Sequence, residues 1–377
     1  MRVLRELSVD VVTASRQRIV NVFDNGLPVY LSFSGGKDSL VLAHLVVELG
    51  RKGAIDLRRL RVEFIDEEAI FHCVETIVKE WREKFLLLGA EFRWYCLEVK
   101  HFSCLNQLEN DESFICWDRF ASDKWVRSPP SFAIRSHPLL RSRVDTYQQF
   151  LERINDGVHI TGVRIYESMQ RRSAISCKFG SYTRTKTEPI YDWKDSDVWL
   201  YLKEHDIKIP DAYIYMYQIG IENSRLRISQ FFSIDTAHTL SRMAEFYPNL
   251  MDDILRREPN AYIVSLYWDS EMFRRRSRKR RTLDDDSEID YKDEVLRLLS
   301  NIPENFNSKG LRKSAEYVKR LLIRCSGHLD ETAYRKAYDI LIAGDPKNRS
   351  IRALQSSIFQ RSARSLEACK VGTIRAS

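Results

Sequence analysis

Short apolar runs alternate with longer amphipathic segments along the first 205 residues of the chain. Five runs have the length and the β-branched or aromatic content of buried strands: 29–33, 60–65, 92–99, 159–164 and 187–190. Segments with helical periodicity lie between them, for example at 40–49 and 68–88. This alternation predicts an α/β fold with a doubly wound parallel sheet, whose ligand binds at the carboxyl ends of the strands.

Residues 100–158 interrupt the alternation with an insertion rich in aromatic and basic side chains. Its large aromatic residues are Phe114, Trp117, Phe120, Trp125 and Phe132. They either pack a small subdomain or form a lid on which a base could stack. His101 and His137 also lie here, but they do not have the spacing of metal ligands.

From residue 236 onward the pattern is helical throughout. An apolar stripe with helical spacing runs through Leu311, Ala315, Val318, Leu322 and Cys325, and most basic residues of this segment fall elsewhere on the helix. We therefore predict two domains: an α/β domain of residues 1–235, with the insertion at about 100–158, and a basic, mainly helical domain of residues 236–377.

The net charge of +7 comes entirely from the second of these regions. Residues 236–377 hold 27 Lys and Arg against 20 Asp and Glu, whereas residues 1–235 hold 33 of each kind. Six arginines and one lysine fall within 274–281, directly before three aspartates at 284–286. Such a run attracts phosphate backbones through counterion release, or it is a solvated linker whose charges partly cancel. Nucleic acid is thus one partner that the C-terminal region predicts.

A glycine-rich turn joins the first predicted strand to the first predicted helix. It reads Ser34, Gly35, Gly36, Lys37, Asp38 and Ser39. The glycines let the backbone approach an anion, the serines supply hydroxyl donors, and the amides at the start of the helix face the same point. Lys37 adds a positive charge, and Asp38 could orient Mg²⁺ or hold the loop. An ordinary glycine turn is the alternative, and the spacing is not that of a Walker A loop.

Two later motifs extend this pattern. One runs from Thr161 through Gly162, Arg164 and Ser168 to Arg171 and Arg172, and the other covers residues 189–199 with the sequence PIYDWKDSDVW. With the S-G-G-K-D-S loop, they resemble the motifs of phosphoadenosine phosphosulfate (PAPS) reductases and N-type ATP pyrophosphatases, also called adenine nucleotide alpha hydrolases. The branch that includes the immunoglobulin-binding regulator A type is the most similar, because there too a longer C-terminal region follows the nucleotide domain.

The resemblance implies a nucleotide-binding domain at 1–235 that takes ATP with Mg²⁺. The loop of residues 34–39 would cradle the β- and γ-phosphates, and Lys37 would offset the charge that grows on pyrophosphate. Arg164 with Arg171 or Arg172 would hold the α-phosphate or a second anionic group. Asp66 follows the second strand, where these families hold adenosine. It could equally be a capping or solvated acid.

The seven cysteines do not form a known reactive pattern. They are scattered without a C-x-x-C pair, which indicates neither a disulfide framework nor a zinc or iron–sulfur site. We therefore expect an ATP pyrophosphatase that adenylates a substrate for sulfur transfer, with sulfur from a partner protein. DNA phosphorothioation is one setting for such chemistry. A PAPS reductase-type oxidoreductase and a regulatory protein that binds nucleotide without turnover remain the alternatives.

No apolar stretch reaches transmembrane length, and the first residues lack the core of a signal peptide. The expected location is the cytoplasm, with no membrane partner.

Overall fold

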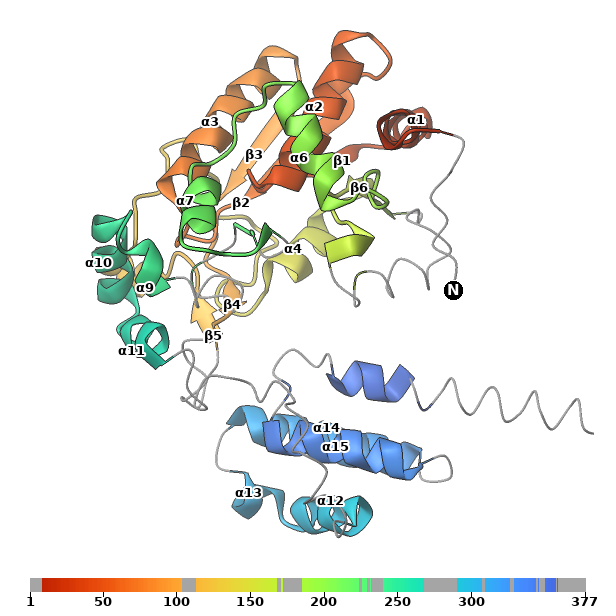
Figure 1. The fold of residues 1–377 in the computed structure, drawn as a ribbon, viewed down its shortest axis with the longest axis vertical. Helices are drawn as coiled ribbons and strands as arrows, with labels where there is room; N and C mark the ends of the chain where they lie inside the picture. Colours follow the sequence, from red (N-terminus) through yellow and green to blue (C-terminus); the bar gives the residue numbers. More distant parts are fainter. Residues whose placement is uncertain are drawn as a thin grey trace, which may run out of the picture. The chain divides into compact units, whose positions relative to one another are not determined.

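The structure is a computed structural model. It describes residues 9–103, 113–167, 171, 185–223, 226–228, 231, 240–267, 290–306, 309–325, 329–343, 345, 350–356 and 358. The chain divides into two compact units, residues 1–102 with 114–265 and residues 103–113 with 266–377 (Figure 1). The domain boundary that the sequence predicts at residue 235 stays a prediction, because contacts alone do not show which segments fold independently.

A parallel five-stranded sheet forms the centre of the first unit. Its order is β3 (Glu91–Tyr95), β2 (Leu60–Ile65), β1 (Val29–Ser32), β6 (Val158–Ile160) and β7 (Lys186–Thr187). All four neighbouring pairs are parallel. The predicted fold class is therefore confirmed, and the change of direction in strand order at β1 places the loop after β1 where such sheets bind ligands.

Helices flank the sheet, while α9 to α11 lie apart from it (Figure 1). In chain order the helices of this unit are α1 (Val11–Asp24), α2 (Lys37–Arg51), α3 (His72–Leu87), α4 (Tyr147–Ile154), α6 (Asp195–Glu204), α7 (Ala212–Gln218), α9 (Leu240–Met243), α10 (Pro248–Arg257) and α11 (Asn260–Tyr267). Three short 3₁₀ helices join them: η1 (Leu57–Arg59), η2 (Arg119–Lys124) and η3 (Ile165–Glu167). Helix α3 begins four residues later than predicted. The reason is that Glu68 has a positive φ of 70° and belongs to a loop.

Three predicted strands are shorter than their apolar runs. The third ends at Tyr95, because the amide of Cys96 then bonds to the carbonyl of Ile134 in the insertion. The fourth ends at Ile160 and the fifth at Thr187, before Pro189 and the turn that leads into α6. Apolar side chains past these ends pack loops instead of extending the sheet, and periodicity alone does not separate the two cases.

The two faces of the sheet differ in polarity. Phe33 follows β1 on the apolar face, where its ring lies 6.0 Å from that of Trp81 and 6.2 Å from that of Phe85 in α3. On the opposite face the register places Ser32 beside Glu63 and Glu63 beside Arg93. Successive strand residues alternate between faces, so polar side chains at 30, 32, 61, 63, 91 and 93 line one side of the sheet.

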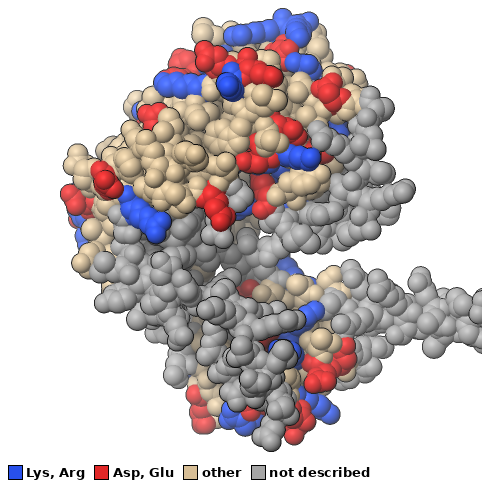
Figure 2. Space-filling model, viewed as in Figure 1, with Lys and Arg blue, Asp and Glu red and all other residues tan. Residues whose placement is uncertain are grey.

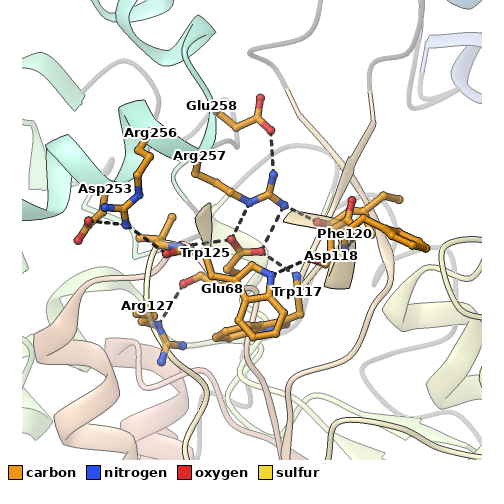
Figure 3. A network of polar contacts seen from close by, with 12 residues as sticks. Glu68, Trp117, Asp118, Phe120, Trp125, Arg127, Asp253, Arg256, Arg257 and Glu258 are labelled. Carbon is orange, nitrogen blue, oxygen red and sulfur yellow. Dashed lines mark hydrogen bonds and ion pairs between the residues drawn. The ribbon is translucent and has the colours of Figure 1, made fainter. Parts of the chain in front are cut away.

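Two buried acids that follow β2, Asp66 and Glu68, contact the insertion. Its strands β4 (Lys100–Phe102) and β5 (Ser113–Ile115) form a two-stranded sheet. Glu68 accepts hydrogen bonds from the amide of Trp117 at 2.7 Å and from Nε of Arg257 in α10 at 2.8 Å (Figure 3). Phe114 and Trp117 are buried whereas Phe120 is 74% exposed. For the buried pair the structure supports the packing interpretation.

The second unit is helical, as predicted. Helices α12 (Tyr291–Ser300), α13 (Ile302–Asn305), α14 (Lys309–Arg324) and α15 (Glu331–Ala343) enclose its core. The predicted stripe is buried at Ala315, Val318, Leu322 and Cys325, with Leu311 packed against it. The basic run at 274–281 lies outside the described residues. None of the helices that the structure describes is long and apolar enough to cross a membrane.

Candidate functional site

The loop between β1 and α2 has the shape that its glycines predict. Gly35 has a φ of +71°, and a Cβ there would lie 2.8 Å from Cγ2 of Val78. Gly36 caps α2, and Ser39 donates its hydroxyl to the carbonyl of Gly36 at 2.9 Å. The amide of Ser34 donates to Oγ of Ser39 at 3.3 Å. A left-handed glycine at a helix N-terminus gives the backbone geometry of an anion-binding turn.

Lys37 is buried at the start of α2. Its Nζ donates to the carbonyl of Leu226 at 2.9 Å and lies 3.7 Å from Asp38 and 3.6 Å from Asp195. Its backbone amide donates to the hydroxyl of Tyr213 at 3.0 Å. The side chain also lies against the rings of Trp199 and Tyr213. The sequence indicates a positive charge at this turn, but it does not indicate the carboxylates and rings that contact Lys37.

Arg164 holds Asp38. Its Nε donates to Oδ1 of Asp38 at 2.5 Å and its Nη2 to Oδ1 of Asp195 at 3.2 Å. Gly162 makes this approach possible, since a Cβ there would lie 3.1 to 3.3 Å from backbone atoms of Asp38 and Ser39. The guanidinium is only 3% exposed and also lies 3.7 Å from Glu167. We expected Arg164 to contact phosphate. Its described partners are carboxylates and a carbonyl, and it lines the cavity beside the loop, so its contact with phosphate stays a prediction.

The structure describes one of the two other predicted arginines. Arg171 pairs with Glu167, and both line the cavity beside the loop. Arg172 lies outside the described residues. Arg227, which our predicted site omits, also lines the cavity and donates to the carbonyl of Glu167 at 2.9 Å. In the sequence, Arg227 lies close to a stretch rich in aromatic residues, and nothing in that pattern distinguishes it from a surface arginine.

The cavity next to the loop has a volume of about 720 Å³. Four kinds of element line it: the loop, the ends of β1 and β2, the segment that follows β6, and the starts of α6 and α7. The predicted residues among its lining are Ser34, Lys37, Asp38, Ser39, Gly162, Arg164 and Arg171. The structure therefore brings three motifs around one space, although the first lies more than 120 residues before the other two in sequence.

Asp66 is not part of that lining. Its carboxylate accepts Nε1 of Trp94 at 2.8 Å and pairs with Arg127, and the residue is fully buried. Its carbonyl accepts Nε1 of Trp117 at 2.6 Å and the hydroxyl of Tyr147 at 3.0 Å. The expected contact with adenosine has no geometric support, because the carboxylate is occupied in holding the insertion on the sheet.

Glu63 is the acid that sequence reasoning missed. It lies on β2, lines the cavity and is 1% exposed. Burial raises its pKa from 4.5 to about 7, and the hydrogen bond from Nδ2 of Asn155, at 3.0 Å, opposes that effect. The signal in the sequence is an acid inside the apolar run Leu-Arg-Val-Glu-Phe-Ile, where a buried strand rarely tolerates one.

The described cysteines are not part of the candidate site. Cys96 and Cys116 are buried, and desolvation raises the pKa of both thiols, as it does for Cys73. None of the described cysteines lines the cavity. Among the same residues no group of three His, Cys, Asp or Glu side chains could hold a metal ion. Cys104, Cys177 and Cys369 fall outside the described residues.

Comparison with known families gives a match to the phosphoadenosine phosphosulfate reductase domain over residues 140–224. This segment holds both later motifs, and the match confirms their resemblance to PAPS reductases. A protein of Escherichia coli strain K12, YbdN, described as uncharacterised, is 30% identical over 247 residues. The match covers 59% of each chain, so this chain spans less than two thirds of that relative.

Two solved structures are similar at low identity. One is a PAPS reductase from Candida auris in a phosphate complex, with a TM-score of 0.30, 10% identity, and coverage of 60% of this chain and 91% of that one. The other is the U34-tRNA thiolase NcsA from Methanococcus maripaludis with its [4Fe-4S] cluster, with a TM-score of 0.32, 11% identity, and coverage of 67% and 78%. Both TM-scores lie below 0.5.

Proposed function

We propose that this chain, which carries a PAPS reductase-type domain of the adenine nucleotide alpha hydrolase superfamily, is an ATP pyrophosphatase that transfers AMP to an acceptor. One observation supports this most strongly. Asp38, in the anion-binding turn, is fixed by Arg164 from a motif 126 residues away, and both residues line a cavity large enough for a nucleotide.

The turn would bind the β- and γ-phosphates of ATP. Backbone amides at the start of α2 and the hydroxyls of Ser34 and Ser39 are the donors that suit phosphate oxygens. Lys37 would give up its bond to the carbonyl of Leu226, because a phosphate is a stronger partner for an ammonium group than a neutral carbonyl. Charge on the departing pyrophosphate would then be balanced by a side chain that is already within the site.

In the proposed reaction an acceptor oxygen attacks the α-phosphorus. A new oxygen–phosphorus bond forms, the bond between the α-phosphorus and the bridging oxygen breaks, and pyrophosphate leaves with that electron pair. Arg171 and Arg227, which line the same cavity, are the cations that could face the nucleotide or acceptor. Asp38 and Asp195 share Arg164, so neither can turn away from the cavity without losing an ion pair.

Mg²⁺ fits this site only together with phosphate. The described residues offer no ready cage of three ligands, but Mg²⁺ at nucleotide sites is commonly held by one or two carboxylates and by phosphate oxygens. Asp38, whose side chain is 20% exposed, would be its protein ligand. When bound, the ion would neutralise charge on the phosphates.

Sulfur transfer to the adenylated acceptor is the second half of the proposal. The match to a PAPS reductase domain supports sulfur chemistry, and the sulfur would come from a partner protein, since no described cysteine lines the cavity. Nucleic acid as acceptor rests only on the charge of the C-terminal region. A PAPS reductase activity is the competing candidate, favoured by the same family match.

Product analysis distinguishes these candidates. The full chain is incubated with ATP and Mg²⁺, or with PAPS and reduced thioredoxin, and the products are separated by ion-exchange chromatography. We expect AMP or an AMP-bearing product with pyrophosphate from ATP, and no sulfite from PAPS. Exclusive formation of ADP and phosphate would refute the pyrophosphatase, and sulfite release would establish the reductase in its place. Binding of ATP with no turnover would favour a regulatory protein.

A further inference from the structure

Two buried polar atoms of cavity-lining residues have no hydrogen-bond partner within the described part of the chain. They are Oε1 of Glu63 and Oγ1 of Thr161. A buried polar atom without a partner destabilises the fold, so folded proteins rarely keep one without a reason. Because both residues line a cavity, a ligand is the partner that could satisfy these atoms.

Strand register places the two residues on either side of Ser32. Ser32 pairs with Glu63 across β1 and β2, while Leu31 pairs with Ile160 across β1 and β6. Thr161 follows Ile160, so it lies level with Ser32 on the side of β1 opposite to Glu63. Ser32 lines the same cavity. We call Glu63, Ser32 and Thr161 the polar floor.

Charge determines which group the polar floor can accept. Arg93 lies beside Glu63 in register, but its Nε donates to Glu91 at 2.6 Å, and Arg61 also donates to Glu91. The only described hydrogen bond to the Glu63 carboxylate comes from the neutral amide of Asn155. Arg93 and Arg61 act on Glu63 only at a distance, and a carboxylate without a direct ion pair repels phosphate and attracts hydrogen-bond donors.

We propose that the polar floor binds a hydroxyl or amino group of the ligand, with Glu63 as the acceptor that determines specificity. The proposal relies on the proposed function only in taking this cavity as the nucleotide site. The donor group belongs either to the nucleoside part of ATP or to the acceptor. Phosphates bind at the turn of residues 34–39, where amides and Lys37 supply positive charge, and are kept off the polar floor.

Isothermal titration calorimetry at pH 8.5 tests this with two probes, α,β-methylene-ATP and inorganic tripolyphosphate, each with Mg²⁺. The variants are Glu63→Gln and Thr161→Val. Gln keeps the size of Glu63, and its amide oxygen can accept the hydrogen bond from Nδ2 of Asn155 as the carboxylate does, so we expect this variant to fold. Glu67→Gln is the matched control, because Glu67 lines the cavity but pairs with His101.

If the nucleoside supplies the donor, Glu63→Gln lowers affinity for the ATP analogue about 10-fold, the usual advantage of a charged acceptor over a neutral one, and Thr161→Val lowers it a few-fold. Affinity for tripolyphosphate stays within twofold. If the acceptor supplies the donor, both affinities are unchanged and pyrophosphate release from ATP falls at least 10-fold.

The proposal is wrong if Glu63→Gln matches the wild type in both affinities and in turnover, or if Glu67→Gln causes the same losses. Failure of the proposed function gives a different result. In that case the wild type either binds neither probe or releases ADP and phosphate, whereas the effect of Glu63→Gln on binding is measured separately from the products.

Discussion

Replacing Glu63 by Gln should make the protein more stable at alkaline pH. The Glu63 carboxyl is 1% exposed, has one neutral donor and has one oxygen without a described partner. Burial disfavours its charged form, so its pKa is about 7 in the folded chain against 4.5 in the unfolded one. Gln has the same shape and carries no charge to bury.

The magnitude follows from the two pKa values. Below pH 4.5 the group is protonated in both states, and its contribution to stability is fully present. Between pH 4.5 and about 7 the unfolded chain releases the proton while the folded chain retains it, so the free energy of unfolding falls as pH rises. The difference of about 2.5 corresponds to about 3 kcal/mol, which is the cost at pH 8 and above.

Urea unfolding followed by tryptophan fluorescence measures this cost. Six of the seven tryptophans lie within residues 1–265, so the signal reports mainly the first unit. We expect wild type and Glu63→Gln to be similar at pH 4.5, and the variant to be up to about 3 kcal/mol more stable at pH 8.5. Other titrating groups are common to both proteins and cancel in the difference.

The neighbouring charged and titratable groups are Arg61, Glu91, Arg93 and Tyr95, and none of them is changed in the variant. Glu67→Gln serves as the control for removing a nearby negative charge. A stability difference between wild type and Glu63→Gln that does not vary with pH would refute the reasoning. It would mean that the carboxylate is compensated in the folded chain and ionises normally.

Three further results follow from the contacts described above. Lys37→Ala and Asp38→Ala should each lower pyrophosphate release about 10²- to 10³-fold, the usual loss when a preorganised charge is removed from a site; wild-type rates in folded variants would place the chemistry elsewhere. Arg257→Ala should destabilise the first unit by about 3 to 5 kcal/mol in urea unfolding, because Glu68 would be left buried without its cation; a loss below 1 kcal/mol would show that water replaces the arginine. Replacing the seven basic residues of 274–281 with glutamine should flatten the salt dependence of duplex-DNA binding by several units of log–log slope, measured by fluorescence anisotropy; a slope near zero for the wild type would exclude nucleic acid as the acceptor.

Features whose signal is local in the sequence could be predicted, whereas contacts between distant segments could not. The turn of residues 34–39 was predictable because its signal is local: a strand, two glycines and a helix in succession. The parallel sheet was predictable for the same reason. The role of Arg164 was not, since it depends on Asp38 and Asp195, which only folding brings within hydrogen-bond distance.

Acids near the end of β2 show a second kind of limit. Periodicity indicates that Asp66 follows the strand, but it does not indicate which residues contact Asp66 in the folded chain. Trp94, Arg127 and the insertion occupy its carboxylate and carbonyl. Glu63 was hidden for the opposite reason, because a single acid inside an apolar run did not change the strand prediction. Only the three-dimensional structure shows that Glu63 is buried and that its Oε1 has no described hydrogen-bond partner.

Attack on the α-phosphorus of ATP is the central claim, and oxygen-18 labelling tests it most directly. The protein is incubated with ATP and Mg²⁺ in water enriched in oxygen-18 without added acceptor, so that water takes the acceptor's place. The products are analysed by phosphorus-31 NMR, in which oxygen-18 shifts the signal of the phosphorus that bears it. The account predicts label in AMP and none in pyrophosphate. Label in pyrophosphate or in inorganic phosphate would contradict it, because water would then have attacked the β- or γ-phosphorus.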